Sequence, residues 1–344
     1  MEQARARHLT IIKPAGSLGR LESIGIWAAG VQGRCPPRPF MRPRVVVFVG
    51  DHSVARTVGT SAYPPEVTAQ MVLNFISGGA AVNVLARQGG AEVRVIDVSV
   101  DCDVEYLSAL GPEIAQHRIR RGSGSIDRED ALTQAESAAA FELGQRIADE
   151  EIDSGADILI AGDMGIGNTT PAATLVGLLA SADAAAVTGL GTGIDDATWM
   201  RKCAAVRDAM RRGRPFMGSP QQLLQVVGGA DIAAMSGFLL QAALRRTPVI
   251  LDGTITTAAA LAVDRMDYRA KSWWIAGHLA AEPAHSIALS RLDMIPLLDY
   301  QMRLGEGTGA LLALPIVQSA IALLHDMATF TEAGVSGRGD LGSS

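Results

Sequence analysis

The sequence predicts an α/β fold with a mostly parallel, Rossmann-like sheet flanked by helices, and a small helical domain formed by the two chain ends. Two observations support this prediction. Short apolar runs rich in β-branched residues recur along the chain, and helical patterns fill most of the intervals between them. The 344 residues are 48% hydrophobic and 19% charged, which is typical of a globular protein with a sizeable core. The chain is long enough for one large domain with an appendage, or for two domains.

The expected strands are apolar runs that each end in glycine or a polar residue, as buried parallel strands do. They are residues 45–49, 93–96, 158–161, 187–188, 249–251 and 273–276. Ligands of open parallel sheets bind outside the carboxyl ends of the strands, so the residues that follow these runs should share a crevice. Asp51, His52, Asp252 and His278 follow three of the runs and are therefore candidate cleft residues.

The most informative segment is residues 162–171, Gly-Asp-Met-Gly-Ile-Gly-Asn-Thr-Thr-Pro, which lies between an expected strand and an expected helix. Thr169 or Thr170 can cap that helix, and Pro171 suits its first turn, where a missing N–H costs nothing. Free N–H groups and the positive end of the helix dipole then face the space above the sheet. The segment predicts an anion site, most often one for a phosphate, with Asp163 at the strand tip.

The glycines of this segment also fit a tight connection that needs them for turn geometry alone, and the segment by itself leaves both interpretations open. Two standard phosphate motifs are absent. No G-x-x-x-x-G-K-[ST] sequence occurs, and residues 165–170 lack the third glycine of the dinucleotide fingerprint. The anion is therefore expected to be a monophosphate rather than a triphosphate or pyrophosphate.

One long helix can be placed from its start signal. Thr133 and Glu136 fit the capping box, so the helix should run to about Ile152 and stop at Ser154 and Gly155. The chain ends differ from the centre, because they contain no strand-like run but do contain a long apolar helix. We expect residues 40–305 to form the large domain that carries the site. Residues 1–39 and 306–334 should form the small helical domain, and residues 335–344 a disordered tail.

Composition excludes several classes of protein. A net charge of −6 and only 4% aromatic residues give neither a basic footprint nor a stacking platform for nucleic acid. Three widely spaced cysteines suggest free thiols in a reducing compartment. The N-terminus lacks a signal-peptide core, and residues 311–324 are interrupted by Pro315, Gln318 and Ser319. That segment is expected to be too short and too polar to span a bilayer. We therefore expect a cytoplasmic protein without a membrane partner.

Residues 305–310, Gly-Glu-Gly-Thr-Gly-Ala, place one carboxylate among three glycines. Such a Glu306 can be semi-enclosed, have a raised pKa and act as a general base, or it can be a solvated side chain in a flexible turn. His278 and His285 have a spacing that suggests metal ligands, but Pro283 lies between them and no fourth ligand is evident. Cleft-wall or core histidines are the better interpretation, and no metal is expected.

Residues 189–193 are similar to the ribose-phosphate loop of ordinary phosphoribosyltransferases, but the order of the parts differs. In those enzymes an acidic pair precedes the Thr-Gly element and handles magnesium pyrophosphate. Here Asp195 and Asp196 follow it. A donor that carries pyrophosphate is therefore not supported.

Taken together, several segments resemble the nicotinate-nucleotide:dimethylbenzimidazole phosphoribosyltransferase family, which activates the lower ligand of cobalamin. They occur in the family's order and cover nearly the whole chain. They are residues 13–22, 50–52, 61–71, 78–83, 162–171, 201–202, 252–253 and 305–310.

The resemblance implies a reaction and a set of site residues. The enzyme would transfer 5-phosphoribose from nicotinate mononucleotide to 5,6-dimethylbenzimidazole, without a cofactor, on a parallel α/β domain of a homodimer. Glu306 would be the catalytic base and Asp163 a second acid. The benzimidazole would be surrounded by Ser61, Tyr63, Gln70 and Leu304. The nucleotide and its phosphate would be held by Gly79, Gly165, Gly167, Asn168, Thr169, Thr170 and Lys202.

The sequence departs from the family's pattern at three positions. Ser53 stands where most members have glycine, Ala280 where serine is common, and Asp163 where glutamate is common. The first two leave the choice of aromatic base open. A nucleotide-dependent oxidoreductase and a non-catalytic nucleotide sensor are the alternatives. The missing glycine fingerprint speaks against the first, and the retention of both Glu306 and Asp163 speaks against the second.

Overall fold

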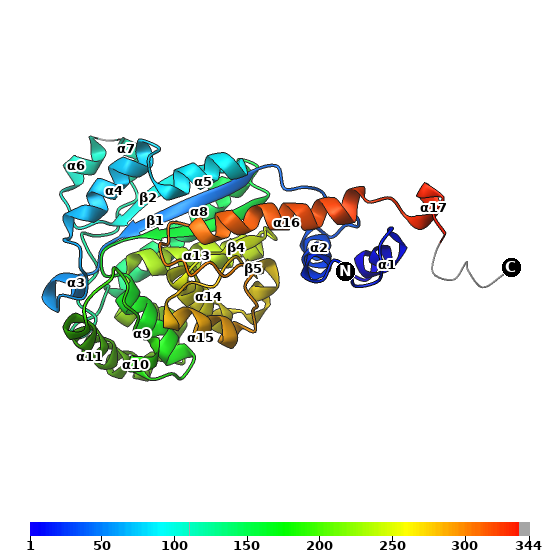
Figure 1. The fold of residues 1–344 in the computed structure, drawn as a ribbon. Coiled ribbons are helices and arrows are strands. Elements are labelled where there is room, and N and C mark those ends of the chain that lie inside the picture. The colour runs from blue at the N-terminus through cyan, green and yellow to red at the C-terminus, as the bar shows by residue number, and fades with distance from the viewer. Residues whose placement is uncertain (110, 337–344) are drawn as a thin grey trace. The chain divides into compact units, whose positions relative to one another are not determined.

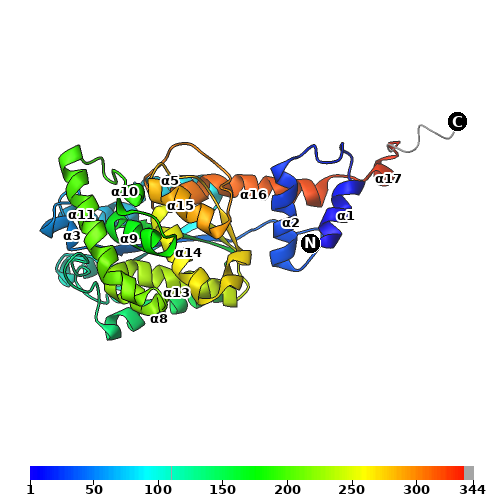
Figure 2. The same ribbon diagram turned by 90° about the horizontal axis from the view of Figure 1, so that it is seen from below.

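The computed structural model describes residues 1–109 and 111–336 of the chain. It divides into two compact units, which are drawn in Figures 1 and 2. The larger unit is Arg42–Leu312, and the smaller one joins Met1–Met41 to Ala313–Ser344. The division at residue 313 leaves Glu306 in the larger unit, whereas we expected the smaller domain to begin at 306. Most of the predicted disordered tail, residues 337–344, lies outside the described residues.

The larger unit contains a five-stranded sheet in the order β2-β1-β3-β4-β5. Every strand pair is parallel, so the prediction of an α/β fold with a mostly parallel sheet is confirmed. This order places a topological switch point between β1 and β3, and open α/β sheets bind ligands at such a point. The strands are β1 (Pro43–Gly50), β2 (Glu92–Ser99), β3 (Ile158–Met164), β4 (Val249–Leu251) and β5 (Trp274–Ala276).

The sixth predicted strand is wrong. Val187 ends a short helix, α10 (Ala184–Val187), and Thr188 is its C-cap. Three alanines precede Val187, and alanine is the strongest helix former, so two β-branched residues are not enough to make a strand there.

Helices cover both faces of the sheet. Long helix α13 packs against α8 and also contacts β1, β2 and β3. Figure 2 shows α8 and α13 together on one side of the larger unit and α5 on the opposite side. In this unit the helices are α3 (Val54–Thr57), α4 (Glu66–Ile76), α5 (Ala81–Gly89), α6 (Val104–Ser108), α7 (Pro112–Ala115), α8 (Gln134–Asp153), α9 (Thr169–Leu179), α10, α11 (Asp196–Gly213), η1 (Arg214–Phe216), α12 (Pro220–Leu223), η2 (Leu224–Gly228), α13 (Ala230–Leu244), α14 (Thr254–Met266), η3 (Tyr268–Trp273) and α15 (Pro283–Leu292).

Two helix starts were predicted from the sequence. For α8 the prediction is confirmed, because the Thr133 hydroxyl accepts the Glu136 N–H and the Glu136 carboxylate accepts the Thr133 N–H. For α9 the predicted cap is wrong. Asn168 occupies the N-cap position, and Thr169 and Thr170 are already helical. Pro171 does lie in the first turn, as expected.

The smaller unit is built from both chain ends. It contains α1 (Glu2–Thr10), α2 (Arg20–Gln32), α17 (Phe330–Ala333) and the later part of α16 (Thr308–Asp326), whose first residues belong to the larger unit. The Arg7 guanidinium joins the two ends by donating to the carbonyl oxygens of Leu324 at 2.7 Å and His325 at 3.0 Å. These contacts satisfy carbonyl groups in the last turn of α16, which have no partner within the helix.

By length and composition alone, two helical stretches of the described chain could cross a membrane, Glu66–Gly89 and Thr308–Asp326. The first is not one helix, because α4 ends at Ile76 and α5 begins at Ala81. The second runs without a break through Pro315, so the expectation that residues 311–324 are too short and interrupted is wrong. Of its most apolar window, 56% is buried inside the protein, and core helices of soluble proteins pass the same test.

Candidate active site

A pocket of about 540 Å³ lies at the carboxyl ends of the central strands, within the larger unit. Its walls come from the loop after β3, from the residues that follow β4 and β5, and from the start of α4. The segment that ends in Glu306 completes the lining. The site therefore draws on residues that are far apart in sequence and that the parallel sheet brings together at one edge.

Glu306 is held in an unusual backbone conformation. Its φ is +62°, in the left-handed region that non-glycine residues rarely adopt, and Gly305 and Gly307 on either side both have φ of +85°. The turn packs directly onto β3. A side chain at Gly162 would place its Cβ 2.5 Å from the carbonyl carbon and oxygen of Glu306, so only glycine fits there. The Glu306 N–H donates to the Asp163 carbonyl at 3.0 Å, which fixes the turn to the strand end.

The Glu306 side chain lines the pocket although the residue is only 3% exposed. Its Oε2 accepts the N–H of Val82, in the first turn of α5, at 3.2 Å. Burial raises the pKa of Glu306 above its usual value of 4.5, the Val82 N–H lowers it, and the negative charge of Asp252 raises it. A carboxylate whose pKa is moved toward neutrality is suited to accept a proton from a substrate.

Asp163 is the second carboxyl group of the pocket and is 6% exposed. Its Oδ2 accepts an N–H from the Asn168 side chain at 3.0 Å, and its Oδ1 has no partner among the described residues. Burial and the charges of Asp252 and Asp231 raise the pKa of Asp163 well above its usual value. The Asn168 bond opposes this shift and Glu306 adds to it. These surroundings favour the neutral form of Asp163 more than water does.

The glycine-rich loop forms one wall of the pocket through Gly165, Gly167, Asn168 and Thr169. It leads into the N-terminus of α9, where the first N–H groups of a helix lack intrahelical acceptors and the helix dipole is positive. Thr170 is fully buried below the surface of the pocket, with its hydroxyl 3.4 Å from that of Thr60. The arrangement suits a phosphate group.

Lys202 lies behind the pocket wall that the glycine-rich loop forms. It belongs to α11, is only 1% exposed and does not line the pocket. Its ammonium donates to the Thr169 hydroxyl at 2.9 Å and to the Gly189 carbonyl at 3.2 Å. An ammonium group has three protons to donate, and these bonds use two of them. Burial lowers the pKa of Lys202, and the nearby charge of Glu282 opposes this effect.

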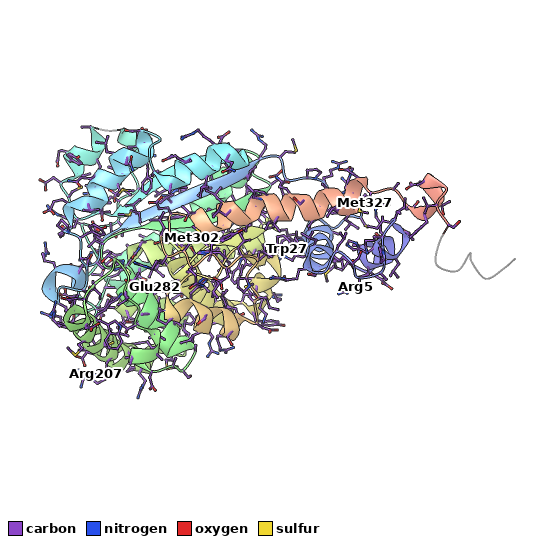
Figure 3. All side chains as sticks on the ribbon, in the orientation of Figure 1. Arg5, Trp27, Arg207, Glu282, Met302 and Met327 are labelled. Carbon is purple, nitrogen blue, oxygen red and sulfur yellow. The ribbon has the colours of Figure 1, made fainter. Side chains whose placement is uncertain are left out.

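Several pocket residues were not predicted from the sequence. Glu282, labelled in Figure 3, accepts the Gly191 N–H at 2.9 Å. Arg303 donates to the Gly191 carbonyl, and the Thr192 hydroxyl accepts the Ala62 N–H at 2.9 Å. Together these side chains hold the loop of residues 189–193 against the pocket. The position of Arg303, three residues before Glu306, was the one sequence signal that could have drawn attention to it.

Of the predicted benzimidazole contacts, Ser61, Tyr63 and Leu304 line the pocket. Gln70 does not, since it is exposed on α4, whereas Val67 and Met71 of the same helix do. Gly79 also lies outside the lining, and its N–H donates to the Asn74 carbonyl between α4 and α5.

Three of the four strand-end candidates are buried beside the pocket rather than in it. His52 pairs with Asp231 at 3.1 Å. Asp51 accepts the N–H groups of Ile166 at 2.9 Å and Asp101 at 2.8 Å. Asp252 likewise accepts backbone N–H groups, which are described below. The fourth candidate, His278, does line the pocket.

His278 and His285 lie close together, with ring centroids 5.7 Å apart. His285 is a core histidine whose Nδ1 accepts the Ala280 N–H at 2.8 Å and whose Nε2 is 3.0 Å from the Thr257 hydroxyl. Across residues 1–109 and 111–336, no group of three or more His, Cys, Asp or Glu side chains is arranged to hold a metal ion.

Comparison with known proteins finds relatives that match nearly the whole chain. A family model described as phosphoribosyltransferase matches residues 1–335. A Mycobacterium marinum protein is 58% identical over 97% of this chain and 91% of its own length. A Mycobacterium tuberculosis protein is 59% identical over the same shares. Both are named nicotinate-nucleotide–dimethylbenzimidazole phosphoribosyltransferase. The crystal structure of CobT from Thermus thermophilus superposes with a TM-score of 0.92 at 42% identity, covering 98% of this chain and 99% of that one. The chain therefore belongs to the nicotinate-nucleotide–dimethylbenzimidazole phosphoribosyltransferase family and is a phosphoribosyltransferase.

Proposed function

We propose that the enzyme transfers 5-phosphoribose from nicotinate mononucleotide to 5,6-dimethylbenzimidazole, with Glu306 as the general base. The products are α-ribazole 5′-phosphate and nicotinate. The names of the relatives support the two substrates. The observation that supports the base is a buried carboxylate with a raised pKa, which a left-handed turn presents to the pocket.

The reaction needs few protein groups. The pyridinium nitrogen of the donor is already cationic, so nicotinate leaves with the electron pair of the glycosidic bond and needs no acid. One benzimidazole nitrogen attacks the anomeric carbon from the opposite face, which converts a β-nucleotide into an α-product. The other benzimidazole nitrogen becomes acidic as positive charge builds, and Glu306 takes its proton.

The donor phosphate binds at the N-terminus of α9, against Gly167, Asn168 and Thr169, with Lys202 behind them. The free N–H groups and the helix dipole support this assignment, as does the Lys202 ammonium, which donates to the Thr169 hydroxyl. The benzimidazole lies against Tyr63 and Leu304, and Val67 and Met71 of α4 supply further apolar lining.

Asp163 is the second acid beside the base. Burial and three neighbouring carboxylates raise the pKa of Asp163, whereas burial and Asp252 alone raise that of Glu306, so we assign proton acceptance to Glu306. The unpaired Oδ1 of Asp163 leaves it free to hydrogen-bond the ribose in the ternary complex. This role predicts a smaller kinetic contribution for Asp163 than for Glu306.

The variant Glu306→Gln tests the base. Gln keeps the shape of the side chain but cannot accept a proton, so we expect kcat to fall by about 10²–10⁴ while the affinity for nicotinate mononucleotide is retained. Nicotinate release measures turnover, and calorimetry measures binding. Asp163→Asn serves as the comparison and should lose less activity. Wild-type turnover in Glu306→Gln would show that Glu306 is not the base. A larger loss in Asp163→Asn than in Glu306→Gln would assign the role of base to Asp163 and that of second acid to Glu306.

We also propose that the enzyme is a homodimer. Leu73 and Ile76 of α4 and Val84 of α5 are exposed apolar side chains on neighbouring helices, and such side chains favour association.

A further inference from the structure

Asp252 lies next to the turn that carries Glu306, yet it is not part of the pocket lining. We propose that Asp252 is a positioning residue for Glu306, whose carboxylate holds residues 305–310 in the backbone geometry that presents the base to the substrate. This inference rests on the proposed role of Glu306. It adds a residue that acts on the reaction without touching either substrate.

The contacts of Asp252 are almost all with that turn. Its Oδ2 accepts the Gly307 N–H at 3.1 Å and its Oδ1 accepts the Ala310 N–H at 2.9 Å. Gly309 contributes a further backbone N–H. These groups belong to the start of α16, so Asp252 caps that helix from a distant part of the chain. A carboxylate is a favourable partner for the positive end of a helix.

Glu306 needs such support because its own conformation is unfavourable. A left-handed φ is unfavourable for a non-glycine residue. Gly305 and Gly307, which flank it, are the least restricted residues of all. The contacts before the turn come from Asp163, whose carbonyl accepts the Glu306 N–H at 3.0 Å. After Glu306, Asp252 accepts the N–H groups of Gly307 and Ala310.

Asp252 is itself fixed by the sheet. It directly follows β4, which pairs with β3 on one side and β5 on the other. The residue is 1% exposed. His278 Nε2 is 3.6 Å from its Oδ1, which is too far for a hydrogen bond, so the backbone N–H groups are its main partners. The end of β4 thus fixes the Asp252 carboxylate, and this carboxylate holds the backbone N–H groups of Gly307 and Ala310.

The titratable and polar groups around Glu306 come from four elements. Asp163 lies at the end of β3, Asp252 after β4 and His278 after β5, and the Val82 N–H belongs to α5. Burial raises the pKa of Asp252, while His278 and the backbone N–H groups lower it. In its ionised form Asp252 opposes ionisation of Glu306. Removing that charge without changing the shape of residue 252 should therefore ease deprotonation of the base.

The test compares Asp252→Asn with Asp252→Glu. In Asp252→Asn we expect kcat to fall about 10- to 100-fold, because the amide has only one acceptor oxygen for the turn and a small misplacement of a catalytic group is costly. The acid limb of the kcat/KM profile should also move to lower pH. Asp252→Glu keeps the charge but alters the geometry, so it should lose kcat with its acid limb in place. Affinity for nicotinate mononucleotide, measured by calorimetry, should change less than about twofold in both.

A matched control is Asp97→Asn. Asp97 is equally buried, lies within β2 and accepts the Val100 N–H at 2.9 Å and the Arg118 guanidinium N–H at 2.6 Å, but it does not line the pocket. We expect it to lower thermal stability and to leave both kcat and the pH profile unchanged. A shift of the limb in Asp97→Asn would show that any loss of a buried charge causes the effect, and it would overturn the inference.

A double variant separates positioning from an independent role. If Asp252 acts through Glu306, adding Asp252→Asn to Glu306→Gln should reduce kcat less than about threefold further. Multiplicative losses would overturn the inference. Full activity of Glu306→Gln would instead overturn the proposed base. If Asp252→Asn does not fold, Asp252→Glu decides the question, since unchanged kcat in a folded Glu variant contradicts positioning.

Discussion

Lys202 shows how a single residue can serve the pocket without lining it. Its ammonium is buried and bonded to Thr169 and Gly189, which belong to the two loops on the phosphate side of the pocket. A buried ammonium is costly unless it is well paired. Burial lowers the pKa of Lys202, and a bound phosphate would raise this pKa again by favouring the charged ammonium.

We predict that Lys202→Met, which keeps the volume but loses the charge, weakens nicotinate mononucleotide binding. A hydrogen bond to a charged group contributes about 1.5–3 kcal/mol, so the dissociation constant should rise roughly 10- to 150-fold. Binding of dimethylbenzimidazole alone should be unchanged. Calorimetry with each substrate separately checks this. An unchanged nucleotide affinity would mean that the phosphate binds elsewhere.

The residues that the sequence revealed differ in kind from those it did not. Glu306 and Asp163 each stand among glycines, and this local pattern marks a carboxylate approached by backbone. Glu282 carries no local signal, because its partner Gly191 is 91 residues away. Gln70 was expected in the pocket because it lies in a matching segment, but the rotation of α4 turns Val67 and Met71 inward instead.

At the scale of elements, strong local signals gave correct predictions and weak ones did not. The reciprocal bonds of Thr133 and Glu136 join residues only three positions apart, so the start of α8 could be predicted. The start of α9 could not, because Asn168 takes the cap position and directs its side chain to Asp163. The Asn168 side chain thus contacts the site and makes no capping bond to its own helix.

The packing of β3 against the Glu306 turn predicts the effect of Gly162→Ala. The added Cβ would lie 2.5 Å from the Glu306 carbonyl and 2.9 Å from the Gly307 nitrogen, so backbone must move. A displacement of about 1 Å at a catalytic group can cost roughly 10² in rate. We therefore expect kcat to fall by this order while nucleotide affinity stays the same.

Gly218→Ala provides the control for this prediction, because a Cβ there meets nothing within 4 Å. It should leave kcat and thermal stability unchanged. If Gly162→Ala retained wild-type kcat, the turn would be able to shift without harm, and the tight packing seen here would have no role in presenting the base.

At the scale of the whole molecule, the sequence predicted a parallel sheet and a crevice at its strand ends, but not the strand order. That order depends on which strands pair, and pairing is a long-range property. It places β1 and β3 at a switch point, next to which the glycine-rich loop and Asp163 lie. The same edge gathers buried ionisable groups whose pKa values are shifted in opposite directions, and these groups make global stability depend on pH.

His285 is a buried group that makes the protein less stable as the pH falls. Burial lowers its pKa from 6.5 to about 3. Between these values the unfolded chain binds a proton that the native protein does not, so stability rises with pH in this range. The contribution of His285 to the unfolding free energy is fully present above pH 6.5. Below that value it falls by about 1.4 kcal/mol per pH unit. Asp51, whose pKa burial raises to about 6, acts in the opposite sense, since its contribution is lost as pH rises.

We therefore predict that the difference in unfolding free energy between the wild type and His285→Gln shrinks as the solution is acidified. The carboxyl groups are common to both proteins and cancel in the difference, which isolates the imidazole. From about pH 7 to pH 5 the difference should fall by about 2 kcal/mol, measured by urea unfolding at each pH. A constant difference would show that His285 accepts a proton in the folded state. The bond from the Ala280 N–H to Nδ1, which requires an unprotonated Nδ1, would then have to break without unfolding the protein.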